Sequence, residues 1–116
     1  MDDQPPGELF LCAPVLAELF SGLEQLPSGA RRNRLAEWIR NLETSEFVDR
    51  ILPFDRSATH EFGRIVAIRE RAGRTIRVMD AIIGAIASAH GATVATRDVD
   101  DFADIGLDVV NPFEAR

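Results

Sequence analysis

The sequence predicts a three-layer α/β domain with a short parallel sheet, and three observations support this class. Short apolar stretches alternate with helical patterns, which favours parallel strands joined by right-handed crossovers. The helix that holds Asp80 in its first turn is apolar on nearly every side, so we expect the protein to enclose it. Gly91 ends that helix, and the apolar residues 92–96 that follow are typical of a buried parallel strand.

A chain of 116 residues fits a single domain, residues 1–116, in which residues 1–7 are expected to form an exposed lead-in. The hydrophobic content of 46% is ordinary for a globular protein, and we expect neither a membrane span nor a signal peptide. Cys12 is the single cysteine, which excludes an internal disulfide and fits the reducing cytoplasm. The net charge of −6 excludes a generally basic surface.

The first part of the chain predicts a strand followed by two helices. Residues 9–12 are expected to form a short buried strand, and Pro14 suits the first turn of the helix that follows it. Glu18 lies in this helix beside the apolar face. Ser28 is expected to cap a second helix, residues 29–43. The buried stripe of this second helix is expected to comprise Leu35, Trp38, Ile39 and Leu42.

The second part of the chain predicts further alternation. A short strand is expected at residues 51–54, and Asp55 or Ser57 is expected to cap a third helix at residues 58–72. At helical spacing this third helix carries Phe62, Ile65, Val66 and Arg69. After the strand at 92–96 we expect one helical turn at residues 100–103 and a last strand at 107–110.

Several acidic residues occur where an α/β domain gathers its ligands. Asp80 opens the buried helix, where the helix dipole favours an acid, and Asp98 follows the next strand. Glu18 and the pair Asp100 and Asp101 could join them. Carboxylates that meet in a chain without lysine repel one another unless a cation lies between them, and oxygen ligands without His or Cys select Mg²⁺ or Mn²⁺ over Zn²⁺. The acids therefore predict either a divalent metal site that activates water against a phosphodiester or a set of solvated surface groups.

Five stretches of the sequence carry a specific combination of motifs, although each alone is weak. They are Leu16–Gly22, Ile51–Asp55, Met79–Ala85, Ala92–Phe102 and Val109–Phe113. In combination they resemble the PIN domain, specifically the VapC-like ribonuclease toxins of bacterial toxin–antitoxin pairs. The resemblance extends without a break over residues 4–113.

The resemblance implies a metal-dependent endoribonuclease of the cytoplasm that binds Mg²⁺ or Mn²⁺, acts on RNA, forms a homodimer and is bound by a cognate antitoxin. Glu18 matches the acid of the family's Ala-Glu-Leu-x-x-Gly helix, and Asp80 matches the acid that opens the late helix. Asp98 falls where relatives carry Asn or Asp after Thr-Arg, and Asp101 matches the acid before Phe. These four acids are the expected catalytic and metal-binding residues, with Asp98 and Asp101 as equal candidates for the last ligand.

Contact with RNA requires an acidic protein to concentrate positive charge locally. We expect such contacts from Arg97, Arg31, Arg32 and Arg34. The last three crowd the start of the second helix, where positive charge opposes the helix dipole. The alternative interpretation of these three residues is a solvated arginine-rich face.

The sequence departs from the family at its start. Family members open with a strand that carries an Asp and with a helix, and we find no match for either ahead of the first resembling stretch. The expected fold is therefore a PIN-like domain whose first, central strand is missing. Losing about four buried aliphatic side chains would forfeit roughly 6–12 kcal/mol, which is comparable to the net stability of a domain. Either the strands at 9–12 and 92–96 pair directly, or the fold is marginal.

Two other functions compete with the toxin. The first is a catalytically inactive PIN fragment that serves as a binding or dimerisation module for an antitoxin. An in-frame strand with an Asp upstream of Met1 would favour the enzyme instead. The second is a phospho-accepting signalling domain, which also gathers acids at strand ends. That class requires a lysine facing the phosphorylated Asp, and all basic side chains here are arginine.

Overall fold

The structure, a computed structural model, describes residues 10–111, so the expected lead-in at residues 1–7 lies outside the described part. The chain divides into two compact units, Met1–Pro53 and Phe54–Arg116. Within the described range four α-helices accompany short parallel strands, which confirms the α/β class. No helix in this range is long and apolar enough to cross a membrane.

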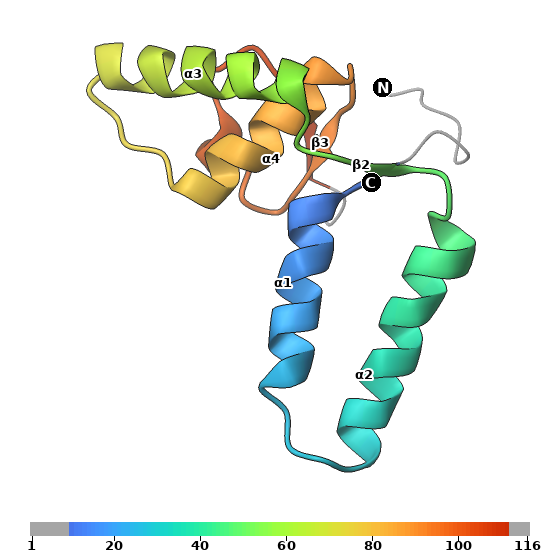
Figure 1. The fold of residues 1–116 in the computed structure, drawn as a ribbon. Coiled ribbons are helices and arrows are strands. Elements are labelled where there is room, and N and C mark those ends of the chain that lie inside the picture. Colours follow the sequence, from blue (N-terminus) through green and yellow to red (C-terminus); the bar gives the residue numbers. More distant parts are fainter. Residues whose placement is uncertain (1–9, 112–116) are drawn as a thin grey trace. The chain divides into compact units, whose positions relative to one another are not determined.

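The first unit is a helical hairpin with a parallel pair of strands (Figure 1). Its elements are β1 (Leu11–Cys12), α1 (Ala13–Glu24), α2 (Ala30–Asn41), a π-helical turn (Leu42–Glu46) and β2 (Ile51–Leu52). Strands β1 and β2 are parallel, with Leu11 opposite Ile51. A small core of Leu16 and Leu23 from α1 and Ile39 from α2 holds the hairpin together.

Two expectations for α2 are wrong. The helix begins after Gly29, which makes no side-chain cap hydrogen bond, so Ser28 is not the cap. Trp38 is 52% exposed and does not belong to the buried stripe. Ile39 is completely buried, and Trp38 lies about 100° away around the helix, which turns it off the face that packs on α1.

The second unit packs two helices against each other and adds a second parallel pair of strands (Figure 1). Its elements are α3 (Arg56–Arg71), α4 (Val78–Ala89), β3 (Val94–Ala95), a 3₁₀ turn (Val99–Phe102) and β4 (Val109–Val110). Asp55 caps α3, as expected, because its Oδ1 accepts a hydrogen bond from the Ala58 amide at 3.1 Å. Strands β3 and β4 are parallel, with Val94 opposite Val109.

Helix α4 is enclosed along one side, whereas Ile82 and Ile83 are half-buried and Val78 at its start is exposed. Its residues Ala81, Ala85 and Ile86 are completely buried. Gly84 permits close contact, because a Cβ at this position would lie 3.2 Å from Leu107 Cδ1 and 3.4 Å from Ile65 Cδ1. Gly91 follows the helix with φ of +64°, a left-handed conformation that glycine adopts without strain.

The described strands form two parallel pairs, one in each unit. The pairing partner of β1 is β2, and the partner of β3 is β4.

Candidate metal-binding acids and their supports

Asp80 is the most enclosed of the predicted site residues. It lies in the first turn of α4 and is 6% exposed. The Arg77 guanidinium forms an ion pair with its carboxylate and donates two hydrogen bonds, from Nε to Oδ2 at 3.2 Å and from Nη2 to Oδ1 at 3.4 Å. The Arg77 side chain itself is 79% exposed. The structure thus buries a carboxylate and supplies a partner cation that lies largely in solvent.

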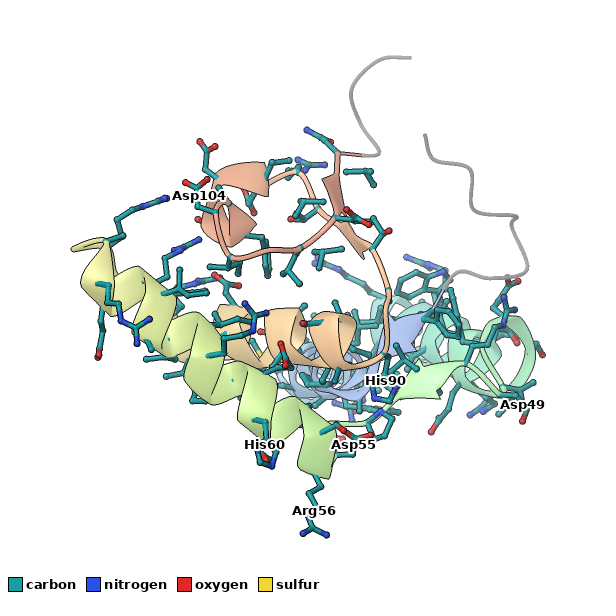
Figure 2. All side chains as sticks on the ribbon, turned by 90° about the horizontal axis from the view of Figure 1, so that it is seen from above. Asp49, Asp55, Arg56, His60, His90 and Asp104 are labelled. Atoms are coloured by element: carbon teal, nitrogen blue, oxygen red, sulfur yellow. The ribbon has the colours of Figure 1, made fainter. Side chains whose placement is uncertain are left out.

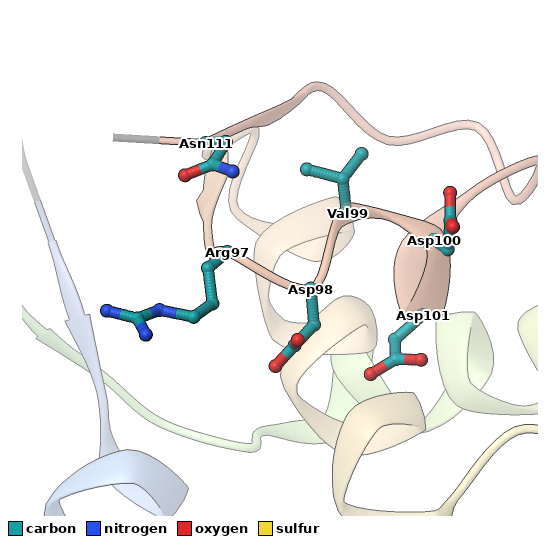
Figure 3. A pocket seen from close by; sticks show the side chains of 6 residues that line it. All are labelled: Arg97, Asp98, Val99, Asp100, Asp101 and Asn111. Atoms are coloured by element: carbon teal, nitrogen blue, oxygen red, sulfur yellow. The ribbon is translucent and has the colours of Figure 1, made fainter. Parts of the chain in front are cut away.

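Asp98 and Asp101 come together at the end of β3. Both are exposed, and both line an open pocket together with Arg97, Val99, Asp100 and Asn111. In Figure 3 the carboxylates of Asp98 and Asp101 point to the same side, whereas that of Asp100 points away from them. The local backbone explains the arrangement: the Asp98 amide donates to Thr96 Oγ1 at 3.0 Å, and the Asp101 amide donates to the Asp98 carbonyl at 3.0 Å.

Arg69 is a support of this pocket that the sequence analysis did not recognise. It lies in α3 and is 3% exposed. Its Nη2 donates to the carbonyls of Asp101 at 2.8 Å and Ala103 at 3.1 Å, and its Nη1 donates to the Thr75 carbonyl at 3.1 Å. Its Nε is buried without a hydrogen-bond partner among the described residues. The available signal was an arginine on the otherwise apolar face of the helix.

Two further arginines hold the same segment. Arg74 Nη1 lies 3.1 Å from Asp104 Oδ2, and Arg64 Nη1 donates to the Ile105 carbonyl at 3.3 Å. Asp104 has φ of +65°, an uncommon conformation for a residue with a side chain. Arginines from outside the acidic segment after β3 therefore hold it, by binding its backbone carbonyls and the Asp104 carboxylate. The carboxylates of Asp98 and Asp101 are left to face the pocket.

Two polar contacts join the ends of α3 and α4 elsewhere in this unit. His90 Nε2 lies 3.1 Å from Asp55 Oδ2, and Figure 2 shows these side chains next to each other. Ser88 Oγ donates to Glu61 Oε1 at 2.7 Å. This hydrogen bond, together with the ion pair to Arg64, holds the pKa of Glu61 below its ordinary value.

Glu18 lies on an exposed position of α1, in the first unit, whereas the three aspartates belong to the second. The convergence of all four acids on one site therefore stays a prediction. Close to Glu18 in sequence, burial raises the pKa of the Cys12 thiol, and the charge of Glu18 adds to that effect. Among the described residues, no three His, Cys, Asp or Glu side chains form a group that could hold a metal ion.

The predicted RNA-binding arginines have different surroundings. Arg97 lines the acidic pocket. Arg32 donates from Nη1 to the carbonyls of Leu23 at 3.1 Å and Leu26 at 2.9 Å, and its Nη2 lies 3.4 Å from Glu24 Oε1. These contacts give Arg32 a structural part in closing the α1–α2 hairpin. Arg31 and Arg34 are exposed on α2.

The sequence matches the PIN domain over residues 1–107. The chain belongs to the PIN-domain family. Its relatives include the plasmid stability protein StbB of Pseudomonas syringae pv. tomato, which is 38% identical over 115 residues, or 99% of this chain and 83% of the relative. The VapC ribonuclease Y4jK of Sinorhizobium fredii is 37% identical over 98% of this chain and 81% of its own length. Toxin FitB of Neisseria gonorrhoeae is 34% identical over 91% and 76%.

The fold is also shared with solved structures. The crystal structure of FitAcB from Neisseria gonorrhoeae superposes with a TM-score of 0.87 at 32% identity, and the match covers 97% of this chain and 81% of that chain. The structure therefore has the PIN-like α/β fold, with short parallel sheets and four helices in its described part. This confirms the resemblance drawn from the five sequence stretches.

Proposed function

We propose that this chain is a metal-dependent endoribonuclease, the toxin of a type II toxin–antitoxin pair. The observation that carries the proposal is the buried carboxylate of Asp80 at the start of α4, in a chain that matches the PIN domain over residues 1–107. A relative named as a VapC ribonuclease and one named as a toxin favour this activity over an inactive binding module.

The donor chemistry fits Mg²⁺ or Mn²⁺. The candidate ligands Glu18, Asp80, Asp98 and Asp101 offer only carboxylate oxygens. Mg²⁺ keeps several waters and uses one or two carboxylates, so it does not require a compact group of three acids. Two carboxylates that face the same open pocket, Asp98 and Asp101, suit such a hydrated ion. The ion would supply charge neutralisation for the phosphodiester and acidify a water.

The protein's own contribution is to fix its acids. Burial and the fork of Arg77 set the orientation of the Asp80 carboxylate, which keeps it from rotating freely as a surface acid would. The hydrogen bonds of Arg69 hold the backbone that carries Asp101. Arg97, at the same pocket, can hold a phosphate of the RNA by its planar guanidinium.

We further propose that the chain acts on RNA in the cytoplasm, that it forms a homodimer, and that a cognate antitoxin binds it. The names of the toxin relatives support an antitoxin as partner. Sedimentation of the purified chain tests the dimer, because a mass close to the 12.8 kDa of one chain at every concentration would contradict it.

The activity is tested with a single-stranded RNA, the full chain and Mg²⁺ or Mn²⁺. We expect cleavage that EDTA abolishes and that Asp80→Asn lowers at least a hundredfold, because a metal ligand is lost. The matched control is Asp49→Asn, which makes the same change at an exposed acid that lies outside the pocket and outside the segment held by the arginines. Cleavage that persists in EDTA, or that Asp80→Asn leaves intact, would show that the chain is not an enzyme of this kind.

A further inference from the structure

Helix α2 concentrates positive charge in an acidic protein. Its 12 residues carry four arginines and one glutamate, although the whole chain has a net charge of −6. The first turn contains no acid, so the arginines there oppose the helix dipole. Helix stability alone does not explain this arrangement.

One of these arginines is explained by the fold and two are not. Arg32 closes the α1–α2 hairpin through the carbonyls of Leu23 and Leu26. Arg31 and Arg34 are exposed, and neither side chain makes a hydrogen bond or ion pair with another residue in the described range. Both guanidinium groups therefore face solvent and are available to a ligand.

Trp38 shares the face of these two arginines. It follows Arg34 by four residues and Arg31 by seven, spacings that place the three side chains in one row along the helix. Trp38 is 52% exposed although it was expected in the core. A large aromatic ring left in solvent in the same row as two exposed guanidinium groups is the arrangement that receives a base and its two phosphates.

The charge of the row decides between a nucleic acid and an apolar protein surface. A protein partner that buries Trp38 would also have to desolvate Arg31 and Arg34, which costs free energy unless carboxylates meet them. A single-stranded RNA offers phosphates at the arginines and a flat base for the indole, and every base has such a face. The same row therefore matches RNA in both its charged and its aromatic parts.

We propose that Arg31, Arg34 and Trp38 form a stacking platform for single-stranded RNA on α2. The proposal rests on the ribonuclease function above and adds to it a substrate-binding surface that lies on α2, separate in sequence from the predicted acids. A base stacks on the Trp38 indole, and the flanking phosphates bind the two guanidinium groups. The platform binds RNA through stacking and charge, so it has little base preference.

The test uses the fact that Trp38 is the only tryptophan of a chain without tyrosine. The full chain in EDTA, which prevents cleavage, is titrated with a single-stranded oligouridylate of about ten nucleotides, and Trp fluorescence is recorded. We expect quenching that saturates with RNA and that weakens as salt rises. An unchanged emission over the titration overturns the proposal.

Paired arginine variants locate the phosphate contacts. Arg31→Gln and Arg34→Gln should each weaken binding and lower the slope of log K against log salt by about 0.7. Arg40→Gln is the control, since Arg40 lies about 160–180° around the helix from Trp38 and Arg31. Equal losses in all three variants would mean that only net charge matters and would overturn the platform.

Tryptophan variants, measured by anisotropy of a labelled oligouridylate, test the stacking itself. Trp38→Leu should weaken binding by about tenfold and Trp38→Phe by less, because a phenyl ring still stacks. RNA binding that neither variant changes overturns the proposal. Tryptophan emission that changes when the protein is diluted but not when RNA is added also overturns it, because that result would assign this face to a second copy of the chain. Metal-dependent cleavage together with any of these results would leave the ribonuclease function standing and remove the platform alone.

Discussion

Arg69 Nη2 donates a hydrogen bond to the carbonyl oxygen of Asp101 at 2.8 Å, across 32 residues of sequence. The arginine is 3% exposed, and it also binds the carbonyls of Ala103 and Thr75. A buried cation on three backbone carbonyls ties α3 to the segment that carries the predicted ligands. Asp101 is thus positioned through its backbone, which leaves its carboxylate directed to the pocket.

Replacing Arg69 should therefore destabilise the protein and loosen the acidic segment. Arg69→Met leaves three carbonyls without their donor, and at about 1–3 kcal/mol for each unsatisfied buried group we expect a loss of several kcal/mol, less after water enters. Urea unfolding measures the loss. Arg71→Met, an exposed arginine of the same helix, is the control and should change stability by less than about 0.5 kcal/mol. Equal midpoints for the two variants would contradict the structural role of Arg69.

Arg69 also shows where prediction from the sequence ends. Helical spacing placed it correctly on the inner face of α3, because periodicity reports which residues face the core. Two of its three partners are carbonyls 32 and 34 residues away, and no local pattern encodes such contacts. By contrast the sequence alone predicted the place of Asp80 at the start of an enclosed apolar helix, and its part as a metal ligand stays a prediction.

Trp38 failed as a core prediction for a related reason. Spacing alone allows a side chain at the edge of an apolar stripe to face inward or outward, and the choice depends on where the partner helix lies. Here α1 covers Ile39 and leaves Trp38 exposed. The partners of the strands could not be predicted in the same way, because short apolar runs predict strands without specifying which strand lies beside them.

Two glycines on packed helices should respond differently to alanine. A Cβ added at Gly63 in α3 would have no described atom within 4 Å, so Gly63→Ala should stabilise the protein by about 0.5–1 kcal/mol through helix propensity. In Gly84→Ala the new Cβ would lie 3.2 Å from Leu107 Cδ1 and 3.4 Å from Ile65 Cδ1. We expect that crowding to offset the gain and to lower stability by about 1 kcal/mol or more relative to Gly63→Ala. Thermal unfolding of the two variants tests this. Equal gains in stability would show that Leu107 and Ile65 move aside for the new Cβ at no cost.

The stability of the second unit should depend on the ionisation of Glu61. The hydrogen bond from Ser88 and the ion pair with Arg64 lower the pKa of Glu61 from its ordinary value of 4.5. A carboxyl group with a lowered pKa in the folded state stabilises above its unfolded pKa, and this contribution is lost as the pH falls through the folded value. We expect the urea concentration at the unfolding midpoint to decrease as the pH is lowered below about 5. In Glu61→Gln this decrease should be smaller.

Ser88→Ala should reduce the same pH dependence by a smaller amount, because the ion pair with Arg64 remains. The comparison is made as differences in midpoint between about pH 6 and about pH 3.5, so that losses independent of pH cancel. If Glu61→Gln and the unchanged chain decline in parallel, the pH dependence arises from other carboxylates.

The two candidates for the last metal ligand can be separated by their side chains. Asp98 and Asp101 point to the same side of the pocket, and Asp100 between them in sequence points away. Mn²⁺ affinity, measured by calorimetry on the full chain, should therefore fall at least about tenfold in Asp98→Asn or in Asp101→Asn and remain unchanged in Asp100→Asn. The three variants alter charge equally within four residues, so a general electrostatic effect would weaken all three alike and would contradict a ligand at this pocket. Arg69→Lys provides a second test, because the Arg69 hydrogen bonds in the described range go to Thr75, Asp101 and Ala103. If Asp101 is the ligand, loosening its backbone should weaken Mn²⁺ binding. If Asp98 is the ligand, this variant should weaken Mn²⁺ binding less.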